Sequence, residues 1–252
     1  MLNVNNDSIL VTRGLTRNFG ALRVTNEVDF DLKAGARHAL IGPNGAGKTT
    51  FVNLLTGILR PSAGTIWANS EDITRASPEQ RVRQGIGRTF QINSLFRELT
   101  VIENIAMPIM AQQSLGNRIF GARSSMKDCF ERSYELLCDF DLQHVADRQV
   151  KNIAYGEQRL VEIAIALGLQ PKVLILDEPA AGIPSSESHV ILDVLRKLPA
   201  SVSILIIEHD MNLVFQFATR ITVLVQGAVL LTDTPDAVAN DARVKEVYLG
   251  NR

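Results

Sequence analysis

The chain has 252 residues, of which 46% are hydrophobic and 21% charged, with 26 basic and 27 acidic side chains. These values are typical of a folded globular protein and exclude long disordered or fibrous segments. A net charge of −1 provides no general field for polyanions, so no nucleic-acid partner is expected. The two cysteines, Cys129 and Cys138, form no Cys/His cluster, which argues against a disulfide framework or a zinc site.

Two features of the sequence bear on membranes and export. The longest uninterrupted apolar run, 163–167, has five residues, whereas a helix that spans a bilayer needs about 20. The amino terminus lacks the basic and apolar segments of an export signal. We therefore expect a cytosolic protein.

The first 60 residues predict two strands, a third strand, a loop and a helix. Alternating apolar residues at 9–12 and 28–32, separated by a turn-like segment at 18–20, predict antiparallel strands. The apolar run 38–41 predicts a buried strand that leads into a glycine-rich segment. Apolar residues at the helical period predict a helix over 48–59.

The rest of the chain predicts a helical insertion followed by alternating helices and strands. Helical apolar faces at 101–107 and 129–140 flank a polar stretch at 112–125. After them, helices are predicted at 158–169 and 188–198, strands at 173–176 and 203–207, and a hairpin at 221–225 and 229–232. Strands that alternate with helices are typical of a parallel sheet, so the predicted fold class is α/β.

The strongest motif is a phosphate-binding loop between the predicted strand and helix. It satisfies G-x-x-x-x-G-K-[ST] with Gly42, Pro43, Asn44, Gly45, Ala46, Gly47, Lys48 and Thr49, and Thr50 follows it. Glycines let backbone amides approach phosphate oxygens, and the helix N-terminus adds about half a positive charge. Lys48 is predicted to bridge the β- and γ-phosphates, and Thr49 to take a position on Mg²⁺. The alternative is a glycine-rich turn with a solvated lysine.

Polar residues follow two predicted strands. Asp177 and Glu178 end one strand, at the edge where parallel sheets place their ligand crevice. We expect Asp177 to hold Mg²⁺, and Glu178 to orient or deprotonate an attacking water. His209 follows 204–207 and is a candidate donor to the γ-phosphate. The alternative for all three side chains is a structural or solvent-facing role.

Residues 153–159, Ile-Ala-Tyr-Gly-Glu-Gln-Arg, resemble the signature segment of the ATP-binding-cassette (ABC) ATPases, and the similarity runs from about residue 9 to residue 250. The resemblance implies that Phe19 stacks on adenine and that Gln91 acts in catalysis and at the Mg²⁺. It also implies that the start of the signature helix binds the γ-phosphate of a facing subunit. The signature residues concerned are Ala154, Tyr155, Gly156 and Glu157. The alternatives are that Phe19 packs in the core and that Gln91 is a surface residue.

Five segments look like the branch of this family that serves branched-chain amino acid importers, namely 89–91, 155–159, 178–182, 207–210 and 247–250. The resemblance implies an ATPase, peripheral on the inner face of the membrane, that uses ATP and Mg²⁺ to power uptake of such an amino acid or a related small organic solute. The implied partners are membrane permease subunits, a solute-binding protein and a second ATPase subunit, identical or different. An apolar notch for a permease helix, or ordinary packing, is expected at Ile92, Leu95 and Phe96.

The resemblance also implies one nucleotide-binding domain over 1–252. Its core covers about 1–90 and 155–235, its inserted helical subdomain about 91–154, and a C-terminal extension about 236–252.

Three positions depart from the family pattern. The family usually has Ser at the position of Ala154, Gly at that of Tyr155, and at that of Pro184 an aspartate that communicates between subunits. Proline lacks an N–H and fixes φ, so altered coupling across the dimer is expected. Two alternative functions remain: a regulatory subunit that binds ATP with little hydrolysis, and a non-transport cassette acting in DNA repair or translation.

Overall fold

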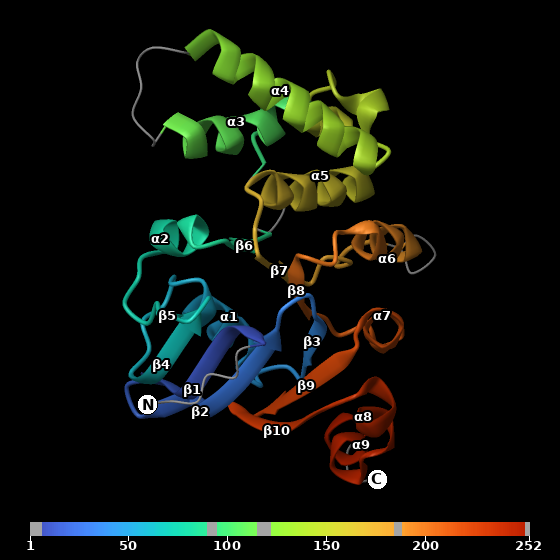
Figure 1. Ribbon diagram of the computed structural model, residues 1–252. Helices are drawn as coiled ribbons and strands as arrows, with labels where there is room; N and C mark the ends of the chain where they lie inside the picture. The colour runs from blue at the N-terminus through green and yellow to red at the C-terminus, as the bar shows by residue number, and fades with distance from the viewer. Residues whose placement is uncertain (1–6, 90–94, 115–121, 184–187, 250–252) are drawn as a thin grey trace. The chain divides into compact units, whose positions relative to one another are not determined.

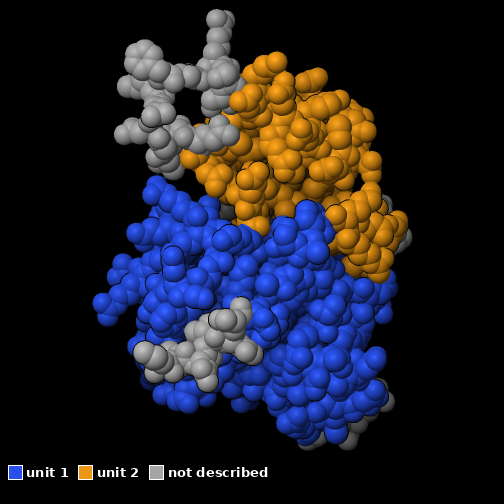
Figure 2. Space-filling view, viewed as in Figure 1, with its two compact units in different colours: residues 1–86, 172–178, 198–252 blue, residues 87–171, 179–197 orange. Residues whose placement is uncertain are grey.

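A computed structural model describes residues 7–89, 95–114, 122–183 and 188–249 of the protein. The chain divides into two compact units (Figures 1 and 2). Unit 1 comprises residues 1–86, 172–178 and 198–252, and unit 2 comprises residues 87–171 and 179–197.

An antiparallel sheet of four strands in unit 1 has the order β2-β1-β4-β5. Its strands are β1 (Ser8–Phe19), β2 (Leu22–Lys33), β4 (Ala63–Ala68) and β5 (Glu71–Asp72). The predicted pair of antiparallel strands is present, but both strands are much longer than predicted. Several register shifts between β1 and β2 interrupt the apolar alternation on which the prediction depended.

The second sheet has six strands in the order β10-β9-β3-β8-β7-β6. Its strands are β3 (Arg37–Ile41), β6 (Ile86–Arg88), β7 (Val173–Asp177), β8 (Ser203–Ile207), β9 (Arg220–Val225) and β10 (Ala228–Asp233). The pairs β3/β8, β7/β8 and β3/β9 are parallel, whereas β9 and β10 form an antiparallel hairpin. These findings confirm the predicted α/β class, the parallel sheet and the final hairpin.

Buried side chains from both sheets and from α1 (Lys48–Leu55) form one core in unit 1. Phe51 of α1 is fully buried, and its ring lies edge-on to Phe30 of β2 with the centroids 5.5 Å apart. The helix ends before residue 59, where the prediction had placed its end, because Gly57 has a φ of 80° and turns the chain out of the helix. The core therefore fixes the helix that follows the glycine-rich loop.

The C-terminal end of α1 is held by a buried cation from the short helix α2 (Pro78–Arg83). Arg81 is 1% exposed, and its Nη1 donates to the carbonyl oxygens of Leu54 and Leu55 at 2.5 and 2.7 Å. It also donates to the carbonyls of Thr74 and Ala76, each at 3.2 Å. Burial lowers the pKa of Arg81 to about 10. A positive charge thus contributes donors to the carbonyls at the end of the helix, where the Leu54 oxygen also accepts from the Gly57 N–H at 3.3 Å.

Unit 2 contains α3 (Val101–Ser114), α4 (Ala122–Asp139), α5 (Tyr155–Gly168) and α6 (Ser188–Lys197), with short 3-10 turns η2 (Gln143–Val145) and η3 (Val150–Asn152). Helices α3, α4 and α5 pack against one another. Helix α5 thus groups with the helices of the insertion, while the domain boundaries expected from the family resemblance stay a prediction.

Besides α2, three further short helices in unit 1 were not predicted: α7 (Met211–Phe217), α8 (Pro235–Asn240) and α9 (Ala242–Leu249). Side chains of Asp210 and Thr234 cap the first two of these helices. Helices of two turns or fewer carry too little periodicity for recognition from the sequence. Throughout the described ranges, no helix combines the length and the apolarity needed to cross a membrane.

We expect Arg81→Met to lower the free energy of unfolding by at least about 3 kcal/mol, because it leaves several buried carbonyls without a donor. The exposed Arg83 on the same helix provides the matched control, and Arg83→Met is expected to change stability by less than about 0.5 kcal/mol. Urea unfolding of the two variants measures the difference. Equal stabilities would show that Arg81 does not hold the end of α1.

Candidate functional site

The glycine-rich loop lies between β3 and α1, as predicted. Its backbone packs closely on neighbouring strands: a Cβ at Gly42 would lie 2.2 Å from the Leu224 carbonyl oxygen, and one at Gly47 would lie 2.5 Å from that of Val24. Gly47, with a φ of 96°, precedes α1, and no side chain among the described residues caps this helix. The amides at the start of α1 therefore face a site that suits an anion.

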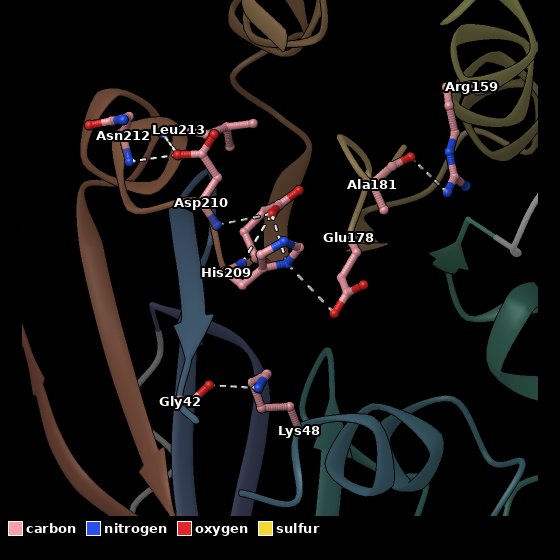
Figure 3. A network of polar contacts seen from close by, with 10 residues as sticks. Gly42, Lys48, Arg159, Glu178, Ala181, His209, Asp210, Asn212 and Leu213 are labelled. Atoms are coloured by element: carbon pink, nitrogen blue, oxygen red, sulfur yellow. Dashed lines mark hydrogen bonds and ion pairs between the residues drawn. The ribbon is translucent and has the colours of Figure 1, made fainter. Parts of the chain in front are cut away.

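Lys48 lies over this loop (Figure 3), where its ammonium group donates to the carbonyl oxygens of Gly42 at 2.7 Å and Pro43 at 3.1 Å. Burial lowers the pKa of Lys48, whereas the nearby charges of Glu178 and Asp177 raise it. In the chain, Lys48 comes after β3 and its loop, while Asp177 ends β7 and Glu178 follows it, all at the carboxyl ends of parallel strands. Lys48 and the strand-end acids thus share one site in unit 1.

Strand register explains why these residues meet. Leu40 of β3 and Asp177 of β7 both pair with Ile207 of β8, so the carboxyl ends of the three parallel strands lie level with one another. The phosphate loop follows β3, Glu178 follows β7, and residues 208–210 follow β8. The ends of parallel strands are where α/β sheets bind their ligands.

Glu178 has a φ of 49°, which is unusual for a residue with a side chain, and its N–H donates to the Ile207 carbonyl oxygen at 2.8 Å. Its carboxylate is half exposed, with Oε1 3.9 Å from Nδ1 of His209 (Figure 3). Strained backbone of this kind is concentrated at functional sites. The geometry leaves the Glu178 carboxylate free to contact both a solvent molecule and His209.

A second acid, Glu208, lies in the segment 207–210 and was assigned no role from the sequence. It is buried, and its Oε2 accepts from the His209 N–H at 3.1 Å and lies 3.8 Å from Nδ1 of the same residue. Asp210 caps α7 through the amide of Asn212 at 2.9 Å. His209 is therefore positioned by a buried acid on one side and a capped helix on the other.

Phe19 lies at the end of β1 and is 44% exposed, which excludes the core alternative for this ring. The Arg17 guanidinium lies 4.7 Å from the ring centroid and was not identified from the sequence. An exposed aromatic ring beside a cation suits stacking of a flat heterocycle.

The signature segment lies in unit 2, at the start of α5. Ala154 precedes the helix and cannot cap it, while its N–H donates to the Glu157 carboxylate at 2.7 Å. That carboxylate also lies 3.0 Å from Nε2 of His144. Among the described residues, a Cβ at Gly156 would meet no atom within 4 Å.

Further along α5, Arg159 and Glu162 form a buried ion pair that the sequence analysis missed. Their Nη1 and Oε2 atoms are 2.9 Å apart, and the two residues are 7% and 4% exposed. Burial raises the pKa of Glu162 to about 7, although the hydrogen bond and charge of Arg159 lower it. Apolar residues surround both positions in the sequence, which gave no signal beyond the i,i+3 spacing.

Gln91, Ile92 and Pro184 lie outside the described residues. Directly after residue 94, where the described residues resume, Leu95 is buried and Phe96 is 58% exposed.

We expect Glu162 to make stability depend on pH. Between its ordinary pKa of 4.5 and the folded value of about 7, the folded chain holds a proton that the unfolded chain has lost. The free energy of unfolding should therefore fall as pH rises through this window, by about 1 to 3 kcal/mol from this residue. Denaturant unfolding from pH 4.5 to 7.5 should give a flatter profile for Glu162→Gln than for the exposed control Glu131→Gln. Parallel profiles of the two variants would contradict the assignment.

Residues 25–181 match the ABC transporter family. The chain is 39% identical over 251 residues to LivG of Escherichia coli K12, described as a high-affinity branched-chain amino acid transport ATP-binding protein, covering 96% of this chain and 98% of LivG. It is 37% identical over 252 residues to the similarly described BraF of Pseudomonas aeruginosa, covering 96% and 98% of the two chains.

Solved structures agree with the sequence comparisons. A nucleotide-free ATP-binding cassette from an ABC transporter superposes with a TM-score of 0.84 and 29% identity, covering 97% of this chain and all of that chain. A second such cassette, in its ADP conformation, gives a TM-score of 0.84 and 29% identity, with coverages of 97% and 99%. The predicted resemblance and fold are confirmed: the chain belongs to the ABC transporter family and is one of its ATP-binding cassettes, an ATPase.

Proposed function

We propose that this ATPase powers the uptake of a branched-chain amino acid or a related small organic solute. Support comes from LivG and BraF, whose names describe branched-chain amino acid transport and which align with 96% of the chain. The observation that carries the catalytic part is the meeting of Lys48, Asp177, Glu178 and His209 at one edge of the parallel sheet.

In the proposed mechanism, the backbone N–H groups of 44–47 and the Lys48 ammonium bind the phosphates of ATP, and Phe19 stacks on the adenine. Thr49 and Asp177 supply a hydroxyl and a carboxylate, oxygen ligands that fit Mg²⁺. When bound, the metal neutralises charge that develops on the phosphate oxygens.

Glu178 accepts a proton from the attacking water, and His209 donates a hydrogen bond to the γ-phosphate while Glu208 holds its backbone. Gln91 completes the set, as the family resemblance implies. Apart from the stacking by Phe19 and the contribution of Gln91, each proposed role in hydrolysis belongs to a residue at or just after the carboxyl end of β3, β7 or β8.

The signature segment acts on a second subunit. The amides at the start of α5, around Gly156, bind the γ-phosphate carried by a facing ATPase, identical or different, so that ATP closes a head-to-tail dimer. Hydrolysis removes the charge that holds each half together. Membrane permease subunits receive the motion at the inner face of the membrane, and a solute-binding protein delivers the solute. The exposed Phe96 is a candidate contact for the permease.

A regulatory subunit with little hydrolysis is the second candidate, and one observation favours it. Ala154 brings no hydroxyl to the signature, so a donor to the γ-phosphate is missing from this side of the dimer. The relatives named above support the transport function over a role in DNA repair or translation.

We expect Glu178→Gln to retain ATP binding and to lower turnover at least about a hundredfold, the scale of general-base effects. Single-turnover hydrolysis by the purified chain, alone and with its companion ATPase, measures the chemical step directly, and calorimetry measures binding. Glu131→Gln, on the exposed face of α4, is the matched control. Undiminished phosphate release by Glu178→Gln would remove this residue from the mechanism, and absence of hydrolysis in the parent chain would favour the regulatory function.

Transport is tested by purifying the tagged chain from membranes with its partners and reconstituting the complex in liposomes. We expect ATP-dependent uptake of leucine, isoleucine or valine in the presence of the solute-binding protein. An active ATPase that takes up none of the three would contradict the proposed solute class. Recovery of ribosomes or DNA without any integral membrane protein would contradict a transport function.

A further inference from the structure

Tyr155, at the position where the family usually has Gly, joins the start of α5 to a separate segment of unit 2. Its hydroxyl donates to the carbonyl oxygen of Ala181 at 3.1 Å. Its ring also lies against the backbone of Gly182, since a Cβ at Gly182 would be 2.7 Å from the hydroxyl oxygen and 3.0 Å from ring carbon Cε1. One side chain therefore contacts two consecutive residues of the segment that follows the catalytic strand.

Arg159 contacts the same carbonyl from the next turn of α5. Its Nη2 is 3.4 Å from the Ala181 oxygen, the contact drawn in Figure 3, and 3.4 Å from the Tyr155 hydroxyl. The guanidinium also lies 5.6 Å from the centroid of the Tyr155 ring. Two donors thus converge on one backbone oxygen.

The buried carboxylate of Glu162 fixes the direction of Arg159. The bond between Arg159 Nη1 and Glu162 Oε2 leaves the other terminal nitrogen, Nη2, for Ala181 and Tyr155. A guanidinium has a planar, rigid set of donors, so holding one nitrogen orients the other. Lysine carries its three donors on a single nitrogen and lacks this rigid, planar arrangement.

The position of Ala181 in the chain gives this cluster a consequence for catalysis. Ala181 follows the proposed general base, Glu178, by three residues, and the boundary between unit 1 and unit 2 falls between Glu178 and Pro179. Proline at 179 restricts φ in this short connection. A displacement of α5 is therefore carried to Glu178 through few rotatable bonds.

We propose that Tyr155 is a positioning residue. Together with Arg159 it joins the start of α5 to the Ala181 carbonyl. Binding of the facing subunit's phosphate at the start of α5 then sets the position of Glu178 in the same chain. This inference rests on the proposed function of the signature and of Glu178. It gives the Tyr155 side chain a role in coupling, in a chain where proline replaces the family's communicating aspartate at 184.

The test compares steady-state ATP hydrolysis by the full chain, with its companion ATPase, in parent, Tyr155→Phe and Arg159→Lys forms. Tyr155→Phe removes one hydroxyl and keeps the ring against Gly182, whereas Arg159→Lys keeps a charge for Glu162. We expect each variant to lower kcat about three- to tenfold, with KM for MgATP within about twofold of the parent value. The double variant should lose less than the product of the two single losses, since both donors serve one carbonyl.

Tyr134→Phe, at an exposed tyrosine on α4, is the matched control and should hydrolyse ATP at the parent rate. Thermal melting separates coupling from folding: the expected melting temperature of Tyr155→Phe is that of the control. A parent-like kcat for Tyr155→Phe would overturn the proposal, as would a loss of kcat accompanied by a matching fall in melting temperature. Failure of the proposed function is distinguishable, because in that case Glu178→Gln would also hydrolyse ATP at the parent rate.

Discussion

The level alignment of β3, β7 and β8 is the constraint on which the site depends. Contacts at the opposite end join β3 to β8: Arg37 donates to the carbonyls of Leu198 at 2.9 Å and Val202 at 2.6 Å, and the Gly35 N–H donates to the Ser203 hydroxyl at 2.9 Å. The buried His38 of β3 also contacts Thr222 of β9, with Nε2 and Oγ1 2.8 Å apart. Together with the backbone pairing, these polar contacts support the alignment that brings the catalytic residues to one edge.

Much of this sheet was predictable, because its strands are short apolar runs between polar turns. The sequence located β8 over its full length and β3, β7, β9 and β10 to within one residue at each end. Elements that depend on distant partners were missed or misjudged: β1 changes register along its length, and β5 has two residues that pair only because β4 lies beside them. Such elements have no periodic pattern of their own.

The site shows the same division between local and distant signals. Lys48, Asp177 and Glu178 belong to contiguous motifs whose spacing indicates their chemistry, and the register of β3, β7 and β8 brings them to the same edge of the sheet. The side chains that support these residues were not recognised from the sequence. Their partners either lie far away in the chain or belong to a helix whose other residues are mostly apolar. Arg17 beside Phe19, Glu208 behind His209 and the Arg159–Glu162 pair are of this kind.

The position of Ala154 directly before α5 gives its missing hydroxyl a second consequence. A serine before a helix has two uses for its hydroxyl, since it caps amides of its own helix as well as contacting a ligand. Alanine does neither, and the Glu157 carboxylate is already engaged by the Ala154 N–H and by His144. The first amides of α5 are then left to an incoming anion without competition from a cap. Loss of the hydroxyl removes one donor to the phosphate but keeps the helix terminus available, which is compatible with a working signature.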